Sequence, residues 1–248
     1  MSDAPSKIPL GRIDIHSHAL PAIDDGCESL EETIEALGAV QRAGFVGSIC
    51  TPHMASEPYP TVTPQHVSVW TDQLRRQLQQ RGLRYQLWPG GEMRLYEGAI
   101  DWMKQHGVPT LAESRCVLLD FWVEKWARWI DKGFAWLLAE GYQPIWAHPE
   151  RMTFDDRKFD KHVRDLAGEG VLLQGNFQCM TGEAGYHADQ RIRRWLDDGL
   201  YSFLALDMHR PPGLEGRLDG ITMVETEYGR AALDALTRDN PRKFIFGL

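Results

Sequence analysis

Histidine and carboxylate side chains near the start of the chain have a spacing that suits metal binding. Residues 14–18 read Asp-Ile-His-Ser-His. Residues two apart on a strand point to the same side, so His16 and His18 can share one ion. Asp14 can then orient one of the two imidazoles from behind. For this segment alone, a chance pair of solvated histidines explains the pattern equally well.

Similar residues recur after later apolar segments. An Asp-Asp-Gly motif stands at 24–26, a Thr-Pro-His motif at 51–53 and a Gly-Gly-Glu motif at 90–92. Each of these, taken alone, is also explained by a turn, an ordinary histidine or a loop. Asp120 differs, because it ends the apolar run 117–119, and a carboxylate in such a run needs a partner or a metal.

Two further motifs complete a set of candidate ligands. His148 lies in Ala-His-Pro-Glu-Arg at 147–151, and an Asp-x-His pair stands at 207–209. The nine candidate metal ligands are His16, His18, Asp25, His53, Glu92, Asp120, His148, Asp207 and His209. Nitrogen and oxygen donors without a thiolate suit Zn, Mn or Fe. Nine donors with several bridging carboxylates predict a cluster of two or three divalent ions.

The four cysteines offer no competing chemistry. No Cys-x-x-Cys pair occurs, so we expect buried, reduced thiols. Cysteine-dependent tyrosine phosphatases carry Arg six positions after the nucleophile. Six positions after Cys27, Cys50, Cys116 and Cys179 stand Thr33, Ser56, Trp122 and Gly185. The pattern therefore argues against cysteine-based phosphate chemistry.

The candidate ligands fall at the ends of predicted strands. Apolar runs predict strands at 12–16, 47–53, 85–89, 116–121, 143–148, 171–176 and 202–207. Helical periodicity predicts helices at 29–43, 64–81, 124–140, 157–168, 187–198 and 217–238. Ser29 with Glu32 forms a capping-box signal, and Pro64 suits the first turn of the next helix.

Alternation of strands with helices predicts an α/β fold with parallel pairing. An open sheet and a closed barrel both fit this order. Because the carboxyl ends of barrel strands converge on one mouth, the position of the polar residues favours a barrel of about seven strands. No linker or composition break divides the sequence, so we expect a single domain over residues 1–248.

The composition excludes several other classes of protein. The chain has 248 residues, of which 43% are hydrophobic and 25% charged, and its net charge is −8. No apolar run approaches the roughly 18 residues of a transmembrane helix, so membrane insertion is not expected. No block of Lys and Arg indicates nucleic-acid binding. The first residues lack the apolar core of a signal peptide, and we expect a cytoplasmic protein.

Motifs along nearly the whole chain resemble the PHP superfamily (polymerase and histidinol phosphatase). The motifs are IDIHSHALPAIDDG at 13–26, TPH at 51–53, GYQPIWAHPER at 141–151, LQGNFQCMTG at 173–182, ALDMHR at 205–210 and LTRDNPRKF at 236–244. Within the superfamily, the chain is most similar to bacterial metal-dependent protein-tyrosine phosphatases of the CpsB/YwqE kind. The combination of the first motif with AHPER is specific.

The resemblance implies a distorted (β/α)7 TIM-like barrel with a metal cluster at its C-terminal mouth, and the nine candidate ligands match the family's positions. Arg151 corresponds to the arginine of AHPER and is expected to hold the phosphate. A further arginine follows the final Asp-x-His motif in the family. Arg210 is our assignment for this catalytic arginine, and Arg217 is the alternative.

The resemblance also implies a function and a partner. We expect metal-dependent hydrolysis of phosphotyrosine on proteins, the substrate being an autophosphorylated bacterial tyrosine kinase of capsule or exopolysaccharide assembly. The alternatives are a small-molecule phosphomonoesterase of the histidinol-phosphatase type and a non-catalytic metal-binding PHP domain. The sequence does not indicate an oligomeric state.

Asp120 and Leu206 depart from the family pattern, and Leu206 stands where the family usually has a small polar residue. Asp120 stands where the family usually has Glu, so we expect it to bind one ion where Glu would bridge two. Four tryptophans lie near the mouth or in the following helix: Trp122, Trp126, Trp129 and Trp136. Core packing at helical spacing is the favoured explanation. The alternative is that one or two form a rim platform for an aromatic phosphoester.

Overall fold

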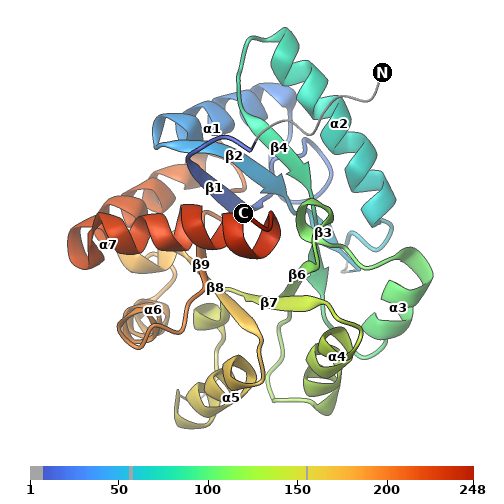
Figure 1. Cartoon of the computed structure of the whole chain (residues 1–248), viewed down its shortest axis with the longest axis vertical. Helices are drawn as coiled ribbons and strands as arrows, with labels where there is room; N and C mark the ends of the chain where they lie inside the picture. The colour runs from blue at the N-terminus through green and yellow to red at the C-terminus, as the bar shows by residue number, and fades with distance from the viewer. Residues whose placement is uncertain (1–7, 56–57, 155) are drawn as a thin grey trace.

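Strands and helices alternate along the chain in the computed structural model, which describes residues 8–55, 58–154 and 156–248. The strands are β1 (Arg12–Ser17), β2 (Phe45–Cys50), β3 (His53–Met54), β4 (Gln86–Pro89), β5 (Glu92–Arg94), β6 (Cys116–Asp120), β7 (Gln143–Ala147), β8 (Leu172–Asn176) and β9 (Phe203–Ala205). The helices are α1 (Leu30–Arg42), α2 (Pro64–Gln80), α3 (Ala99–His106), α4 (Arg128–Ala139), α5 (Asp156–Gly168), α6 (Tyr186–Asp197) and α7 (Leu214–Asp234). The helices surround the strands (Figure 1).

The strands form two parallel sheets, as the alternating pattern predicts. One sheet has the order β1-β2-β4 and the other has the order β3-β5-β6-β7-β8-β9. A parallel bridge between Ser17 and Met208 joins the end of β1 to the segment after β9. The amide of His18 donates to the carbonyl of Met208 at 2.8 Å. The first and last strands of the chain are therefore neighbours at their carboxyl ends.

The chain passes from one sheet to the other at two breaks, one within the predicted strand 47–53 and one after the predicted strand 85–89. The prediction of a single strand over 47–53 is wrong, because β2 ends at Cys50 and β3 pairs with β5 in the second sheet. Pro52 has no N–H to donate, and its carbonyl accepts from Glu92 N at 3.1 Å. Gly90 and the residue after it separate β4 from β5. A Cβ at Gly90 would lie 2.7 Å from Ile49 Cγ2, so this break requires glycine.

The six predicted helices all form, with ends shifted by a few residues. Ser29 caps α1 as expected, since its hydroxyl accepts from Glu32 N at 3.2 Å, and Pro64 begins α2. Helix α4 begins four residues later than predicted, after Ala127 in an extended conformation. Helix α3 was not predicted; it is short and follows a left-handed glycine without a side-chain cap. No helix in the described ranges is long and apolar enough to cross a membrane.

Two apolar clusters support the strands on their two faces. The smaller cluster takes one or two residues from several strands, among them Ile15, Leu118 and Phe203, and includes Ile245 near the C-terminus. The larger cluster lies between the strands and the helices and includes Leu119. Residues two apart on a strand share a face, so Asp120 follows Leu118 on the inner face. Strand alternation therefore directs this carboxylate toward the mouth.

Three of the four tryptophans singled out in the sequence pack against the larger cluster. Trp126 and Trp129 meet Phe121 edge-on, with ring centroids 5.9 and 6.3 Å away. Trp136 is half-buried against the same cluster. Trp122 differs, because 39% of its surface is exposed. Core packing thus explains three of these residues and leaves Trp122 on the rim.

Candidate metal centre at the carboxyl ends of the strands

The predicted ligands converge on one cavity of about 430 Å³, here called the central cavity. Most come from the carboxyl end of a strand or from the residues just after one, where parallel strands expose side chains at a common mouth. His53 and Glu92 begin the short strands β3 and β5, and Asp25 lies in the loop after β1. The cavity lining comprises Asp25, His53, Glu92, Asp120, Trp122, His148, Arg151, Gln178, Asp207, His209 and Arg217. His16 and His18 lie fully buried beneath it.

Eight of the nine predicted ligands form three groups whose donor atoms lie within 4.8 Å of one another. The groups are His18, Asp25, His53 and His209; His16, His18 and Asp207; and His16, Glu92 and His148. His16 and His18 each belong to two groups, and their Nε2 atoms are 3.3 Å apart. The strand spacing of these two histidines therefore places each of them in two neighbouring groups.

Glu92 provides a test of whether these residues fit a cation. Its Oε1 is 3.0 Å from His148 Nε2. Its Oε2 is buried and makes no hydrogen bond to any described residue, although His53 Nδ1 is 2.8 Å away and His16 Nε2 is 3.4 Å away. A buried carboxylate oxygen without a hydrogen bond is costly unless a cation satisfies it. The donor set therefore fits a divalent metal ion.

Residues outside the cavity fix the orientation of the two central imidazoles. His18 Nδ1 is 2.6 Å from Asp24 Oδ2, and His16 Nδ1 is 2.9 Å from Gln174 Oε1. A proton on each Nδ1 leaves each Nε2 lone pair directed into the site. Gln174 in turn donates to Asn176 at 2.7 Å, and Asn176 donates to Asp207 at 2.8 Å.

The sequence analysis missed these orienting residues and assigned the role to Asp14. That assignment is corrected, because Asp14 Oδ1 accepts from the backbone amides of Leu206 at 3.0 Å and His16 at 3.5 Å. Asp14 thus ties β1 to the segment after β9 and does not contact a ring nitrogen. Gln174 and Asn176 show the two-residue spacing of strand neighbours, a signal that could have identified them.

The carboxylates around the imidazoles attract positive charge strongly. Burial alone would lower the pKa of His18, but Asp24 and Asp207 raise it to about 10. Burial likewise opposes protonation of His53, yet Glu92 and Asp25 raise its pKa to about 12. Burial would raise the pKa of Asp207, but the neighbouring His16 and His18 hold it well below its usual range. In the absence of metal, protons occupy the positions that a cation would take.

Two donors stand on strained backbone. His148 has φ of 35° and Asp207 has φ of 48°, both in the left-handed region. Non-glycine residues adopt this conformation at a cost of order 1–3 kcal/mol, and such strain is concentrated at functional sites. The strain turns both side chains into the mouth directly after β7 and β9.

Of the two arginines assigned to the site from the sequence, Arg151 lies in the central cavity and Arg210 does not. Arg151 lines the central cavity, and its Nη1 donates to Asp207 Oδ2 at 3.1 Å. The assignment of Arg210 is corrected: its guanidinium pairs on the surface with Glu28 and with Glu32, the latter at 2.8 Å. Arg217 lines the cavity instead, held by the carbonyls of Leu206 and Asp207 at 2.9 Å. Helix α7 returns this more distant arginine to the mouth.

Asp120 lies in the cavity but outside the three donor groups of the described residues. Its Oδ2 accepts from Arg94 Nη1 at 3.0 Å and from Trp122 Nε1 at 3.1 Å. Burial and the nearby Glu92 raise the pKa of Asp120. The Asp120 carboxylate, one methylene shorter than the family's usual Glu, thus accepts hydrogen bonds from Arg94 and from the indole of Trp122.

The cysteines provide no nucleophile at this site. All four are free and buried. Burial raises the pKa of Cys27 and Cys116 to about 11 and that of Cys50 to about 12, and it raises the pKa of Cys179 well above its usual range. Because the thiolate is the reactive form, these thiols are inert at neutral pH.

The fold and the site together define a class: parallel α/β proteins with a candidate metal centre at the carboxyl ends of the strands. Solved structures with little sequence similarity share this fold. The Escherichia coli phosphotriesterase homology protein superimposes with a TM-score of 0.60 at 12% identity, over 96% of this chain and 99% of its own.

The chain belongs to the CpsB/CapC family of capsular polysaccharide synthesis proteins, whose family model matches residues 12–246. Tyrosine-protein phosphatase CpsB of Streptococcus pneumoniae is 29% identical over 242 residues, covering 94% of this chain and 98% of the relative. Tyrosine-protein phosphatase YwqE of Bacillus subtilis is 29% identical over 197 residues, covering 79% and 77%. A solved structure from work on YwqE and CpsB, described there as unique metal-dependent tyrosine phosphatases, has a TM-score of 0.82 at 27% identity and covers 93% of both chains.

Proposed function

We propose that this chain is a metal-dependent phosphatase that hydrolyses phosphotyrosine on proteins. The observation that carries the proposal is the convergence of eight nitrogen and oxygen donors in three groups, beside two arginines that line the same cavity. The relatives named tyrosine-protein phosphatases support the substrate class. The family's description as capsular polysaccharide synthesis proteins supports an autophosphorylated tyrosine kinase of capsule assembly as the protein substrate.

We assign two or three divalent ions, Mn, Fe or Zn, to the three donor groups. The proposed ligands are His16, His18, Asp25, His53, Glu92, His148, Asp207 and His209. Bound divalent ions supply Lewis acidity, which lowers the pKa of a coordinated water and neutralises charge on phosphate oxygens. Asp24 and Gln174 keep His18 and His16 in the tautomer that binds a cation through Nε2.

Arg151 and Arg217 are assigned to the phosphate. Arg151 is fixed by Asp207 on one side and lies 5.5 Å from the centre of the Trp122 ring on the other. A guanidinium held in place before the substrate arrives stabilises charge on the equatorial oxygens without reorganising. The tyrosyl oxygen has a pKa of about 10 once released, so its departure needs little help from a general acid.

The finer description of the fold is also part of the proposal. If β2 with β3, and β4 with β5, are each counted as one broken strand, the nine strands of the described residues become seven. The bridge from Ser17 to Met208 then brings the first strand beside the last. We therefore infer a distorted (β/α)7 barrel of the PHP superfamily, forming one domain over residues 1–248.

The test uses purified protein with its metal content measured. It should hydrolyse p-nitrophenyl phosphate and a phosphotyrosine peptide, and a chelator should abolish both activities until metal is restored. Iodoacetamide should leave activity intact, because the thiols are buried. Strong preference for histidinol phosphate would indicate the small-molecule phosphatase. Bound metal without turnover of any phosphomonoester would indicate a non-catalytic domain.

A further inference from the structure

We propose that the tyrosyl ring of the substrate binds in an aromatic cavity beside the central cavity, and that Asp120 and Arg94 hold Trp122 as the wall between the two. This inference rests on the proposed function and deepens it by assigning the residues that select an aryl phosphate. Trp122 would contact the substrate, whereas Asp120 would be a positioning residue that acts through it.

The aromatic cavity has a volume of about 690 Å³ and is lined by four aromatic side chains: Tyr59, Tyr96, Trp102 and Trp122. Four residues line both this cavity and the central cavity: Asp25, His53, Asp120 and Trp122. Asp25 and His53 are proposed metal ligands, which leaves Trp122 as the large aromatic surface shared by the two spaces. Only one ester oxygen separates the ring of phosphotyrosine from its phosphorus. With the phosphate in the central cavity, the ring must therefore lie against a side chain that borders both spaces.

Trp122 is exposed and yet fixed in orientation. Its indole N–H donates to Asp120 Oδ2 at 3.1 Å, and Arg94 Nη1 holds the same oxygen at 3.0 Å. Asp120 itself is 3% exposed, so the anchor is buried while the ring faces solvent. A large aromatic surface kept open by a buried hydrogen bond is typical of a binding surface.

The neighbours of Trp122 place it next to the phosphate site. Its ring lies 6.2 Å from that of His148 at an interplanar angle of 29°. The Arg151 guanidinium lies 5.5 Å from the centre of the Trp122 ring. Trp122 therefore adjoins both a proposed metal ligand and the proposed phosphate-binding arginine.

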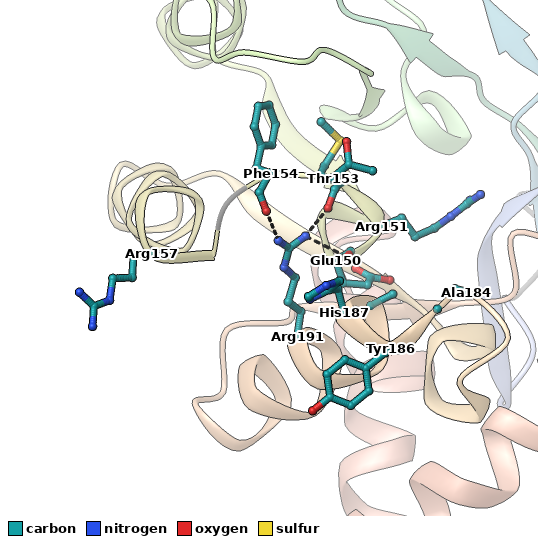
Figure 2. Close-up of a pocket in the computed structure, with 12 residues that line it drawn as sticks. Glu150, Arg151, Thr153, Phe154, Arg157, Ala184, Tyr186, His187 and Arg191 are labelled. Atoms are coloured by element: carbon teal, nitrogen blue, oxygen red, sulfur yellow. Dashed lines mark hydrogen bonds between the residues drawn. The ribbon is translucent and has the colours of Figure 1, made fainter.

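A second cavity, of about 650 Å³, also reaches Arg151 but suits the ring less well. Of the three arginines that line it, Arg191 is buried and donates to the carbonyls of Met152 and Phe154, the latter at 2.6 Å. Arg191 therefore supports the loop that carries Arg151. Tyr186 is 72% exposed, and Figure 2 shows it extending away from Arg151. Tyr186 thus provides a matched control on the opposite flank.

The experiment compares phenylphosphonate with methylphosphonate, two non-hydrolysable phosphate mimics, binding to the metal-loaded protein in a calorimeter. Wild-type protein should bind the phenyl compound roughly tenfold more tightly, as expected for ring stacking with apolar burial. Trp122→Ala and Asp120→Ala should reduce this ratio to about one. Asp120→Asn retains an acceptor for the indole and should keep the ratio, as should Tyr186→Ala. Metal content should stay unchanged in all four variants.

Other outcomes would overturn the inference. Equal weakening of both phosphonates in Trp122→Ala would show that Trp122 only positions Arg151, and loss of the ratio in Tyr186→Ala would place the ring in the second cavity. Loss of metal in both Asp120 variants would identify Asp120 as a ligand. The proposed function fails separately, if metal-loaded wild-type protein does not hydrolyse a phosphotyrosine peptide.

Discussion

At the scale of single residues, the candidate metal donors are held in place by side chains outside the three donor groups. Asp24 holds the ring of His18, and Asn176 holds the carboxylate of Asp207. Arg151 is likewise fixed by Asp207 before any substrate arrives. Such fixed neighbours keep donors and charges in place during a reaction.

Removing Arg151 tests the phosphate assignment. Arg151→Ala should lower turnover of a phosphotyrosine peptide by roughly 10²–10³-fold, the usual cost of losing one charge stabiliser. Metal content should not change, because a guanidinium does not bind a cation. Arg210→Ala is the control and should stay within a few fold of wild type, since Arg210 pairs with Glu28 and Glu32 on the surface. Equal losses in both variants would contradict the assignment.

Asp24→Asn tests the orientation of His18. The amide keeps the size of the side chain but removes the charge that favours a proton on His18 Nδ1, 2.6 Å away. Metal affinity should fall about 10–100-fold, as for other second-layer partners of histidine ligands. Competition with a fluorescent chelator measures the change. Asp72→Asn, on the exposed face of α2, should match wild type, and an unchanged affinity in Asp24→Asn would remove the orienting role.

At the scale of secondary structure, the site depends on close packing of segments near the mouth. Helix α7 carries Arg217 and packs against the turn 177–181 that follows β8. A Cβ at Gly220 would lie 2.1 Å from the carbonyl oxygen of Phe177. The same turn contributes Gln178 to the cavity. The position of Arg217 therefore depends on a glycine in the helix.

Gly220→Ala should destabilise the protein, because neither backbone can move away cheaply. The expected loss is about 1–3 kcal/mol or more, as for overpacked cores. Gly38→Ala is the matched helical control, since its nearest neighbour is the flexible Arg42 guanidinium at 3.4 Å. That change should stabilise by about 0.4–1 kcal/mol. Urea midpoints at constant m-value measure both, and similar midpoints would refute the close approach.

At the scale of the whole molecule, negative charge is concentrated where the strands end. The chain carries a net charge of −8, and Asp25, Glu92, Asp120 and Asp207 all line the central cavity. Histidines face them from neighbouring strands. The metal-free protein balances these carboxylates with protons on imidazoles.

Metal binding should therefore release protons and weaken as the pH falls. Burial opposes protonation of His16, His18 and His53, but the carboxylates outweigh it and raise all three pKa values. With His18 near 10, a cation at pH 7 must displace its proton. Each displaced proton makes the apparent affinity fall about tenfold per unit of decreasing pH. Calorimetry in buffers of different ionisation enthalpy counts the protons, and none released at pH 7 would contradict this expectation.

The sequence by itself determined the alternation of strands with helices and eight of the residues that the structure brings together at the candidate metal centre. Two physical regularities account for this. Strand neighbours two apart share a face, which predicts His16 with His18. Parallel strands expose their carboxyl ends on one side, which predicts that His53, Glu92, His148 and Asp207 meet. Both depend on local spacing and strand direction, which a sequence records directly.

Only the tertiary structure decided which polar residues outside those patterns reach the mouth. Arg210 and Arg217 both follow the final Asp-x-His motif. Arg210 pairs with Glu28, just before α1, and with Glu32 in α1, whereas α7 brings Arg217 to the cavity. The sequence predicts Asp120 as a ligand, and only the structure shows that Arg94 and Trp122 both donate to its Oδ2. The separation along the chain ranges from 2 residues, between Asp120 and Trp122, to 182 residues, between Glu28 and Arg210. Long, flexible side chains choose among such neighbours by packing, and local sequence does not encode that choice.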